Sequence, residues 1–378
     1  MSVPTALQVR SSAGLYGADR VVLALDGALQ RGGAADSRIL AIRNYRMSHQ
    51  PLFEAAQARG QRPRLLPCRG RLDPATAAAL AAEIGPRGAT VVHAHDYKSA
   101  FYAWLATRQR PAPLVATLHG WTDSSRALRV YGRMELALLR RFDALVVVAR
   151  AQAERLLQAG VPAVRIHQVD NGIELPAAAA DPTDALRRAL GLAPEAVAFA
   201  AVARLAPEKN LDLLLEAFAV VAREDDRVVL LVIGDGPERA ALQAQALRLG
   251  LGERARFLGE CAGMDRVYPA VDCLVLSSRT EGMPLVVLEA MAHGLPVVAT
   301  AVGDVPRLLA QSAHGRLVPP ADSAALAAAL REAAAEAGAR DAAARAFVLE
   351  RHAPERMAAA YLDIYDAVLE RAHGRKAS

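Results

Sequence analysis

Residues 198–210 read AFAAVARLAPEKN, an apolar run that passes directly into charged residues. The run from Ala198 to Ala203 is short and apolar throughout, which is typical of a strand buried on both faces of a parallel sheet. Arg204 follows this strand at once, and Lys209 stands where the next helix is expected to start. The stretch therefore predicts a strand, a polar loop and a helix in succession, the repeating unit of an α/β fold.

The same alternation of short apolar runs and helical patterns extends along the rest of the chain. In the first half, the predicted strands are Leu7–Arg10, Arg38–Arg43, Arg64–Pro67, Thr90–His95, Leu114–Leu118 and Ala144–Val148. In the second half, they are Ala198–Ala203, Val228–Ile233, Ala255–Leu258, Cys273–Leu276, Pro296–Ala299 and Gly315–Val318. With helices between them, these strands predict two Rossmann-like, doubly wound parallel sheets.

The length of 378 residues exceeds what one hydrophobic core usually organises, so two domains with a cleft between them are expected. The stretch Leu175 to Asp184, LPAAAADPTD, has two prolines and no periodicity, and is interpreted as the linker. The predicted domains are residues 1–173 and 174–354. A last helix, Glu355 to about Arg371, carries apolar residues at helical spacing and needs a surface to cover.

Charge is distributed unevenly over the two halves. Residues 1–180 carry 23 Lys and Arg against 13 Asp and Glu, whereas residues 181–378 carry 22 against 27. The basic half is interpreted either as a solvated surface or as a face that contacts a membrane peripherally. A nucleic-acid partner is not expected, because no aromatic residues are interleaved with the arginines and no binding motif is present.

The sequence gives no indication of a bound metal, a disulfide framework or a membrane span. Cys68, Cys261 and Cys273 have no metal-ligand spacing, and no D-x-D or H-E-x-x-H motif occurs. The first residues lack the pattern of a signal peptide, and there is no long uncharged apolar stretch. A cytoplasmic protein without cofactor or metal is therefore expected.

Ligands of open parallel sheets bind at the carboxyl ends of the strands, so polar residues at these positions are the first candidates. Arg204 and Lys209 could hold a diphosphate at the start of a helix. Two cations that merely flank a turn are the alternative interpretation.

A second segment, residues 277–294, reads SSRTEGMPLVVLEAMAHG. Glu281 is expected to open a helix, and Gly282 to leave the nearby backbone amides free for phosphate or sugar oxygens. Glu289 lies in a very apolar part of that helix, where a carboxylate is costly unless it is hydrogen-bonded or paired. Ligand hydroxyls or a structural arginine would satisfy it. A helix between the two glutamates would separate them by about 12 Å.

Weaker candidates precede these segments. Gly14 and Gly17, in SSAGLYGADR, could let backbone amides approach a phosphate, although two glycines also suit an ordinary turn. Asn171 lies in the turn VDNGI. His93, His95 and His119 end two predicted strands, TVVHAH and LVATLHG, and together indicate a polar site.

Taken together, these residues resemble glycosyltransferase family 4, retaining enzymes of the GT-B fold with two Rossmann-like domains facing a central cleft. Glu281 and Glu289 match the family's E-x7-E motif, and they are accompanied by R-x4-K at Arg204 and Lys209. The segments GDGP at 234–237, FLG at 257–259 and VDNGI at 169–173 agree in order and spacing.

The resemblance implies a role for each matched residue. Arg204 and Lys209 would bind the donor diphosphate, and Glu289 the nucleotide ribose. Glu281 and the amides after it would meet the transferred sugar, and His119 would contact that sugar near the reacting carbon. The remaining donor-binding residues that it implies are Gly14, Gly17, Asn171, Gly259, Gly282, Met283, Pro284 and Leu285. The last helix would pack back on the first domain.

Two departures from the family pattern are visible. The usual double glycine of the first loop is here GLYGAD, so Gly14 and Gly17 compete for the phosphate-facing role. In AVGDVPRLL, Arg307 stands where many members carry a glutamate.

The predicted function is a retaining transfer from a UDP- or GDP-sugar to a glycan or lipid-linked acceptor in cell-envelope polysaccharide or lipopolysaccharide synthesis. A silent nucleotide-sugar-binding scaffold or sensor, or an epimerase of the same fold, is the alternative. The intact charged residues argue against silence, and the front half lacks the further acid and base carboxylates that an epimerase would need.

Overall fold

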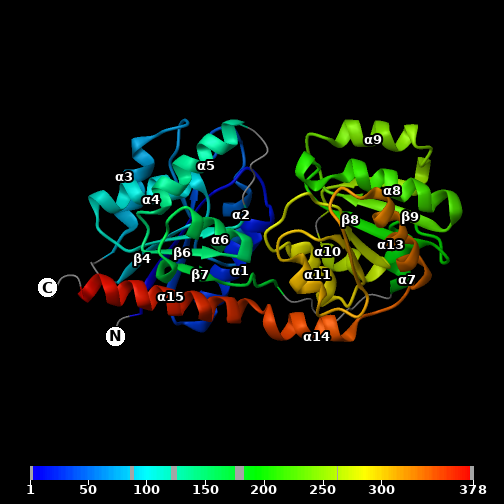
Figure 1. The fold of residues 1–378 in the computed structure, drawn as a ribbon. Helices are drawn as coiled ribbons and strands as arrows, with labels where there is room; N and C mark the ends of the chain where they lie inside the picture. The colour runs from blue at the N-terminus through cyan, green and yellow to red at the C-terminus, as the bar shows by residue number, and fades with distance from the viewer. Residues whose placement is uncertain (1–2, 86–88, 121–125, 175–182, 262, 375–378) are drawn as a thin grey trace. The chain divides into compact units, whose positions relative to one another are not determined.

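The computed structural model describes residues 3–85, 89–120, 126–174, 183–261 and 263–374. Its contacts divide the chain into two compact units, Met1–Glu174 together with His352–Ser378, and Leu175–Arg351 (Figure 1). Of the predicted linker, residues 175–182 lie outside the described residues. Its last two residues, Thr183 and Asp184, already belong to a helix, so the linker prediction extends too far.

The first unit is built on a seven-stranded sheet of order β3-β2-β1-β4-β5-β6-β7, in which all neighbouring strands are parallel. The strands are β1 Thr5–Ser11, β2 Asp36–Ile42, β3 Arg64–Leu66, β4 Thr90–Ala94, β5 Leu114–Leu118, β6 Ala144–Val147 and β7 Ile166–Gln168. The order reverses between β1 and β4, which makes their carboxyl ends the topological switch point of this sheet.

The helices of the first unit follow the strands in turn. They are α1 Gly17–Gly32, α2 Pro51–Ala58, α3 Pro74–Glu83, α4 Tyr97–Gln109, α5 Arg126–Leu139, α6 Arg150–Gln158 and α15 Pro354–Gly374, with a 3-10 turn at Ala163–Arg165. Two aspartates fix where helices begin. The carboxylates of Asp73 and Asp96 accept hydrogen bonds from backbone N–H groups in the first turns of α3 and α4.

The second unit has a six-stranded parallel sheet of order β10-β9-β8-β11-β12-β13. The strands are β8 Val197–Val202, β9 Val228–Ile233, β10 Ala255–Gly259, β11 Cys273–Leu276, β12 Val297–Thr300 and β13 Gly315–Val318. The helices are α7 Thr183–Ala189, α8 Leu211–Glu224, α9 Arg239–Arg248, α10 Met264–Val267, α11 Leu285–Ala292, α12 Val305–Leu309, α13 Ser323–Ala335 and α14 Ala342–Arg351. Short 3-10 turns occupy Pro207–Lys209, Gly252–Arg254 and Tyr268–Ala270. The switch point of this sheet lies between β8 and β11.

All twelve predicted strands are present, and each end lies within two residues of its predicted position. The fold class predicted from the sequence is therefore confirmed. One strand was missed, β7, because its three residues Ile166–Gln168 are half-buried or exposed and form no apolar run.

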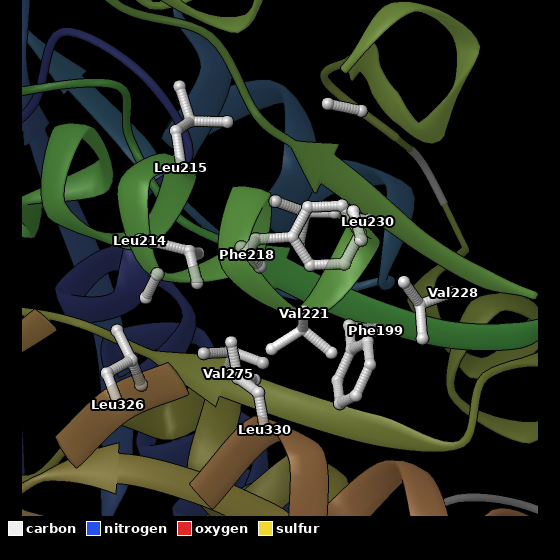
Figure 2. Close-up of a cluster of buried hydrophobic side chains, with 14 of the residues drawn as sticks. Phe199, Leu214, Leu215, Phe218, Val221, Val228, Leu230, Val275, Leu326 and Leu330 are labelled. Carbon is white, nitrogen blue, oxygen red and sulfur yellow. The ribbon is translucent and has the colours of Figure 1, made fainter. Parts of the chain in front are cut away.

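A cluster of buried side chains holds the second unit together. Figure 2 shows Phe218 and Val221 of α8 packed over the sheet residues Phe199 and Leu230. The rings of Phe199 and Phe218 meet edge to face at a centroid distance of 6.2 Å. Each such buried side chain contributes about 1.5–3 kcal/mol to folding. This packing fixes β8 within the sheet and so determines where the loop that carries Arg204 begins.

The long helix α15 completes the first unit. It is the red helix in Figure 1, and it contacts α1 and β4. The apolar residues that recur at helical spacing along it are all buried: Met357, Tyr361, Ile364, Tyr365 and Leu369. Although α15 is the longest helix in the described residues, none of the helices there combines the length and apolarity that crossing a bilayer would require.

Candidate functional site

The carboxyl ends of β8 and β11 bring the main candidate residues of the second unit to one edge of the sheet. Arg204 lies two residues after the end of β8, and Lys209 closes the 3-10 turn that follows. Ser278 and Glu281 lie in the loop after β11. Since β8 and β11 are parallel neighbours at the switch point, these loops occupy the usual ligand position of an open α/β sheet.

Lys209 and Glu281 form an ion pair although they are 72 residues apart in sequence. The Lys209 Nζ donates to Glu281 Oε1 at 2.6 Å, and Ser278 Oγ donates to the same oxygen at 2.6 Å. Of the three N–H groups of the Lys209 ammonium, two remain for other acceptors. The pair can therefore keep its contact while the ammonium binds phosphate oxygens.

Arg204 is held by a carboxylate as well. Its Nη2 donates to Glu208 Oε1 at 2.7 Å, and its side chain is 48% exposed. Partial burial raises the pKa of Glu208, but the hydrogen bond and charge of Arg204 outweigh this effect, so that the pKa is lowered. Glu208 therefore stays ionised, and the guanidinium keeps further N–H groups for an incoming anion.

Two helix starts differ from the predictions. Lys209 is not in the first turn of α8, because Asn210 adopts a left-handed conformation, φ 53°, and α8 begins at Leu211. Glu281 does not open a helix either, since α11 begins only at Leu285. Pro284 explains the delay, because a residue that precedes proline is disfavoured in helical conformation.

The expected 12 Å helical separation of Glu281 and Glu289 is therefore wrong, since only Glu289 belongs to α11. Glu281 and Gly282 precede the helix in the loop, and Met283 and Leu285 are buried around Pro284, the N-cap. The backbone N–H groups of the first helical turn lie at this end of α11, where helices leave N–H groups without intrahelical partners.

Glu289 is half-buried on α11 rather than fully buried. Tyr268 Oη donates to its Oε2 at 2.7 Å. The tyrosine provides the hydrogen bond that the sequence suggested would come from a ligand or an arginine, and Tyr268 was not predicted.

The GDGP segment supports the loop that carries Arg204. A Cβ on Gly234, φ 126°, would lie 2.0 Å from the carbonyl oxygen of Ala203. A Cβ on Gly236 would lie 2.4 Å from the carbonyl oxygen of Leu205. The two glycines thus permit a backbone approach on both sides of Arg204, which no other residue type could allow without a shift.

Gly259, another predicted donor-binding residue, ends β10 with φ 74°. Its carbonyl oxygen accepts a hydrogen bond of 2.7 Å from the N–H of Gly234. Gly259 is thereby connected to the GDGP segment and, through it, to the Arg204 loop.

A glycine that the sequence reasoning missed fixes the Glu281 loop. Gly303, φ 54°, packs so closely that a Cβ would lie 2.4 Å from the carbonyl oxygen of Glu281 and 2.5 Å from that of Gly282. The N–H of Asp304 donates to Gly282 O at 2.9 Å. The signal was present in AVGDVPRLL, where a glycine follows a buried strand. In the same segment, Arg307 Nε donates to Asp304 Oδ2 at 2.8 Å, so the side chain that departs from the family pattern holds this loop.

The predicted glycines of the first unit lie between β1 and α1. Gly14 forms a tight turn, in which Ser12 Oγ donates to its carbonyl oxygen at 2.6 Å, and Gly17 is the exposed first residue of α1. The helix start already has a negative partner, because Asp19 Oδ2 accepts from the N–H of Tyr16 at 2.9 Å. Arg10 in turn donates to Asp19 at 3.0 Å, a buried ion pair that sequence reasoning missed.

The predicted histidines gather at the carboxyl ends of β4 and β5. His95 Nδ1 lies 3.0 Å from His119 Nε2, while His93 contacts Tyr365 Oη and Thr117 Oγ1, each at 2.7 Å. Burial lowers the pKa of His93 to about 3, and burial also lowers the pKa values of His95 and His119 well below the usual value. All three imidazoles are therefore neutral near pH 7.

Asn171 is buried in the VDNGI turn that follows β7. His352 Nδ1 contacts its carbonyl oxygen at 2.9 Å, and the N–H of Ile173 donates to the carbonyl oxygen of His352 at 2.9 Å. These bonds join the VDNGI turn to the residues just before α15.

Asp26 on α1 is fully buried, and it gives a testable pH dependence. Burial raises its pKa to about 6 from the ordinary 3.8, although hydrogen bonds from Ser37 and Gln30 oppose the shift. Because the folded state binds this proton more tightly, its contribution to stability is present below pH 4 and is lost as the pH rises through 6. The shift corresponds to roughly 3 kcal/mol.

We expect Asp26→Asn to remove this dependence. Urea titrations at pH 4 and pH 7.5 should show the variant gaining stability relative to the wild-type protein by up to about 3 kcal/mol at the higher pH. Asp36→Asn, at a neighbouring carboxylate that is more exposed, serves as the control. If the free energies of unfolding of the wild-type protein and Asp26→Asn differed by the same amount at both pH values, the raised pKa of Asp26 would be contradicted.

Comparison with known proteins agrees with this geometry. The family model for glycosyl transferases group 1 matches residues 182–346, and the model for glycosyltransferase family 4 matches residues 16–176. A D-inositol 3-phosphate glycosyltransferase from Actinosynnema mirum is 34% identical over 276 residues, covering 66% of this chain and 65% of the relative. One from Saccharomonospora viridis is 35% identical over 260 residues, covering 62% and 59%. The matches thus span less than two thirds of these relatives.

Solved structures share the fold over nearly the whole chain. Anabaena Alr3699/HepE in complex with UDP and glucose superposes with a TM-score of 0.83 at 20% identity, covering 96% of this chain and all of that one. Sucrose-phosphate synthase from Thermosynechococcus elongatus superposes with a TM-score of 0.79 at 22% identity, covering 97% and 100%. With two Rossmann-like parallel-sheet units and two family models that together span most of its length, the chain belongs to glycosyltransferase family 4 and has the GT-B fold.

Proposed function

We propose that this chain transfers a sugar from a nucleotide diphosphate sugar to an acceptor hydroxyl group, with retention of configuration at the anomeric carbon. The observation that carries the proposal is the Lys209–Glu281 ion pair beside Arg204 at the switch point of the second sheet. Two cations with unused N–H groups suit a leaving diphosphate, whose negative charge grows as the glycosidic bond breaks.

Each matched residue receives a role in this proposal. Arg204 and Lys209 stabilise the leaving diphosphate, and Glu289, oriented by Tyr268, binds the ribose hydroxyls. Glu281 meets the transferred sugar. Further donor contacts are assigned to Gly14, Gly17, Asn171, Gly259, Gly282, Met283, Pro284 and Leu285. His119 contacts the transferred sugar, and the departing diphosphate accepts the proton of the attacking hydroxyl.

The proposed acceptor is a glycan or a lipid-linked saccharide used in envelope synthesis, reached at the cytoplasmic face of a membrane. The excess of Lys and Arg in residues 1–180 supports this choice. The names of the relatives favour a second acceptor, D-inositol 3-phosphate, whose phosphate would also suit a basic unit.

A screen of nucleotide sugars for thermal stabilisation tests the donor first. UDP-glucose leads the panel because the Anabaena protein was crystallised with it, and GDP-sugars follow. The stabilising donor is then mixed with lipid-linked acceptors, glycans or D-inositol 3-phosphate, and NMR of the product gives its anomeric configuration. Binding without release of nucleotide diphosphate would favour the silent scaffold, and conversion of the donor sugar without acceptor would favour the epimerase.

We also predict that transfer needs no divalent metal, because Arg204 and Lys209 supply positive charge for the diphosphate. The turnover number should stay unchanged when the protein is treated with EDTA and assayed in its presence. Activity that disappears with EDTA and returns with Mg²⁺ or Mn²⁺ would show that a metal ion shares this role.

A further inference from the structure

A chain of buried hydrogen bonds connects Asp26 on α1 to His119 at the end of β5. Ser37 Oγ donates to Asp26 Oδ1 at 2.7 Å, and Gln8 Nε2 lies 3.5 Å from Ser37 Oγ. Gln8 Oε1 lies 2.8 Å from His95 Nε2, and His95 Nδ1 lies 3.0 Å from His119 Nε2. Asp26, Ser37 and Gln8 have no exposed surface, and His95 is 2% exposed, so water does not compete for these bonds.

The direction of each bond follows from the carboxylate. An ionised Asp26 only accepts, so the hydroxyl hydrogen of Ser37 points to it and Ser37 Oγ is left as an acceptor. The Gln8 amide then turns its NH₂ toward Ser37 and toward Tyr365 Oη, which lies 3.1 Å away. Gln8 Oε1 consequently faces His95, and it needs a donor there.

The two imidazoles follow in sequence. Burial keeps both neutral, so each has a single N–H. His95 must carry it on Nε2 to satisfy Gln8, which makes His95 Nδ1 an acceptor for the Nε2–H of His119. The remaining nitrogen of His119, Nδ1, is then a bare acceptor. This atom is buried and has no hydrogen-bond partner within the described residues.

We propose that Asp26, Ser37, Gln8 and His95 are positioning residues that fix the tautomer of His119, with hydrogen on Nε2 and a free lone pair on Nδ1. The inference rests on the proposed function for its use: an imidazole of this form accepts a hydrogen bond from a substrate hydroxyl and cannot donate a proton to one from Nδ1. His119 therefore contributes substrate orientation.

A branch through Tyr365 extends the same bond directions from Gln8 to His93. Tyr365 Oη accepts from Gln8 Nε2, so its own hydrogen goes to His93 Nδ1 at 2.7 Å. His93 then carries hydrogen on Nε2 and donates to Thr117 Oγ1 at 2.7 Å. All three histidines are thus expected in the same tautomer.

The reverse arrangement needs a hydrogen-bond donor at position 26, which makes the chain sensitive to its first member. If such a donor caused Gln8 to flip, the bonds from Ser37 to His119 would reverse, and His119 would carry a buried hydrogen on Nδ1 without an acceptor in the described residues. The amide introduced by Asp26→Asn can donate to Ser37 Oγ, which frees the Ser37 hydroxyl to donate to Gln8. That substitution should therefore move hydrogen onto His119 Nδ1.

Long-range ¹H–¹⁵N NMR of the ¹⁵N-histidine-labelled protein tests this at pH 7.5 without substrate. His93→Gln, His95→Gln and His119→Gln assign three of the nine histidines. We expect the Nε2–H tautomer for all three in the wild-type protein. In Asp26→Asn, the ¹⁵N shifts of the two His119 nitrogens should exchange, whereas Asp36→Asn should leave the spectrum unchanged.

Wild-type His119 with hydrogen on Nδ1 would overturn the inference, as would an Asp26→Asn protein, folded by circular dichroism, that retains the wild-type tautomer. If Asp26→Asn does not fold, Ser37→Ala is the second variant, and it should give both tautomers because Gln8 loses the acceptor that orients it. The spectra need no activity. If the protein shows the expected tautomers but transfers no sugar, the proposed function is refuted and the inferred hydrogen-bond chain still holds.

Discussion

Replacing Lys209 with alanine should lower the turnover number by about 10-fold to 150-fold, since a charged hydrogen bond contributes roughly 1.5–3 kcal/mol. Its effect on donor binding should be smaller, because the charge on the leaving diphosphate is greatest in the transition state. The loss should approach the upper limit. Glu281, whose side chain is only 10% exposed, would keep Ser278 as a partner but lose its counter-ion.

Arg204→Ala should also lower the turnover number, but by a smaller factor than Lys209→Ala, because the Arg204 side chain is 48% exposed and its charge is screened by solvent. Arg279→Ala is a matched control, since it removes an equal charge from the same loop region while its exposed side chain pairs only loosely with Asp212 at 3.7 Å. Steady-state kinetics on the folded variants decide the matter. Near-normal turnover in both Lys209→Ala and Arg204→Ala would remove the basis for the diphosphate site.

Glu289→Gln provides a contrast within the same assay. Ribose hydroxyls keep nearly the same position and charge as the reaction proceeds, so this change should mainly raise the KM for the donor. A fall in kcat with unchanged KM would mean that Glu289 acts on the reacting centre instead.

Gly303→Ala should lower kcat/KM by about 100-fold, because the Glu281 loop must move and a displacement of about 1 Å at a reacting centre has effects of that order. The added methyl group would lie within 2.5 Å of two backbone carbonyl oxygens, those of Glu281 and Gly282. Backbone atoms cannot rotate away as a flexible side chain can. The left-handed φ of 54° adds a further cost of roughly 1 kcal/mol.

Gly338→Ala is the control for this prediction. Gly338 also has a positive φ, 84°, but a Cβ there would meet nothing within 4 Å. It should lose about 1 kcal/mol of stability with unchanged kinetics. If Gly303→Ala and Gly338→Ala had the same unfolding temperature and the same kcat/KM, the close contact between Gly303 and the Glu281 loop would not contribute to activity.

The sequence predicted the strands well because their signal is local. Runs such as Val228–Ile233 and Leu114–Leu118 are buried along their whole length, and Thr117 is the one polar residue in them. β7 escaped prediction because it pairs on one side only, at the edge of the sheet, and is too short and exposed for such a run.

The candidate site was predictable in identity but not in geometry. The motif spacing selected Lys209 and Glu281, yet their ion pair depends on the pairing of β8 with β11 across 72 residues. The start of α11 was placed too early because apolar periodicity outweighed the effect of Pro284. Gly303 and Tyr268 were missed because a close approach between loops, or a single hydroxyl, leaves no periodic signal.

The return of α15 to the first unit has a consequence for the order of folding during synthesis. Residues 175–351 are contiguous, so the second unit is complete once its own last helix has been made. The first unit still lacks Tyr361 and Tyr365, whose hydroxyls contact Thr117 and His93 in its core. Strands β1 to β7 therefore belong to the unit whose core is completed after the second unit, and its buried polar groups lack these two partners until α15 has been made.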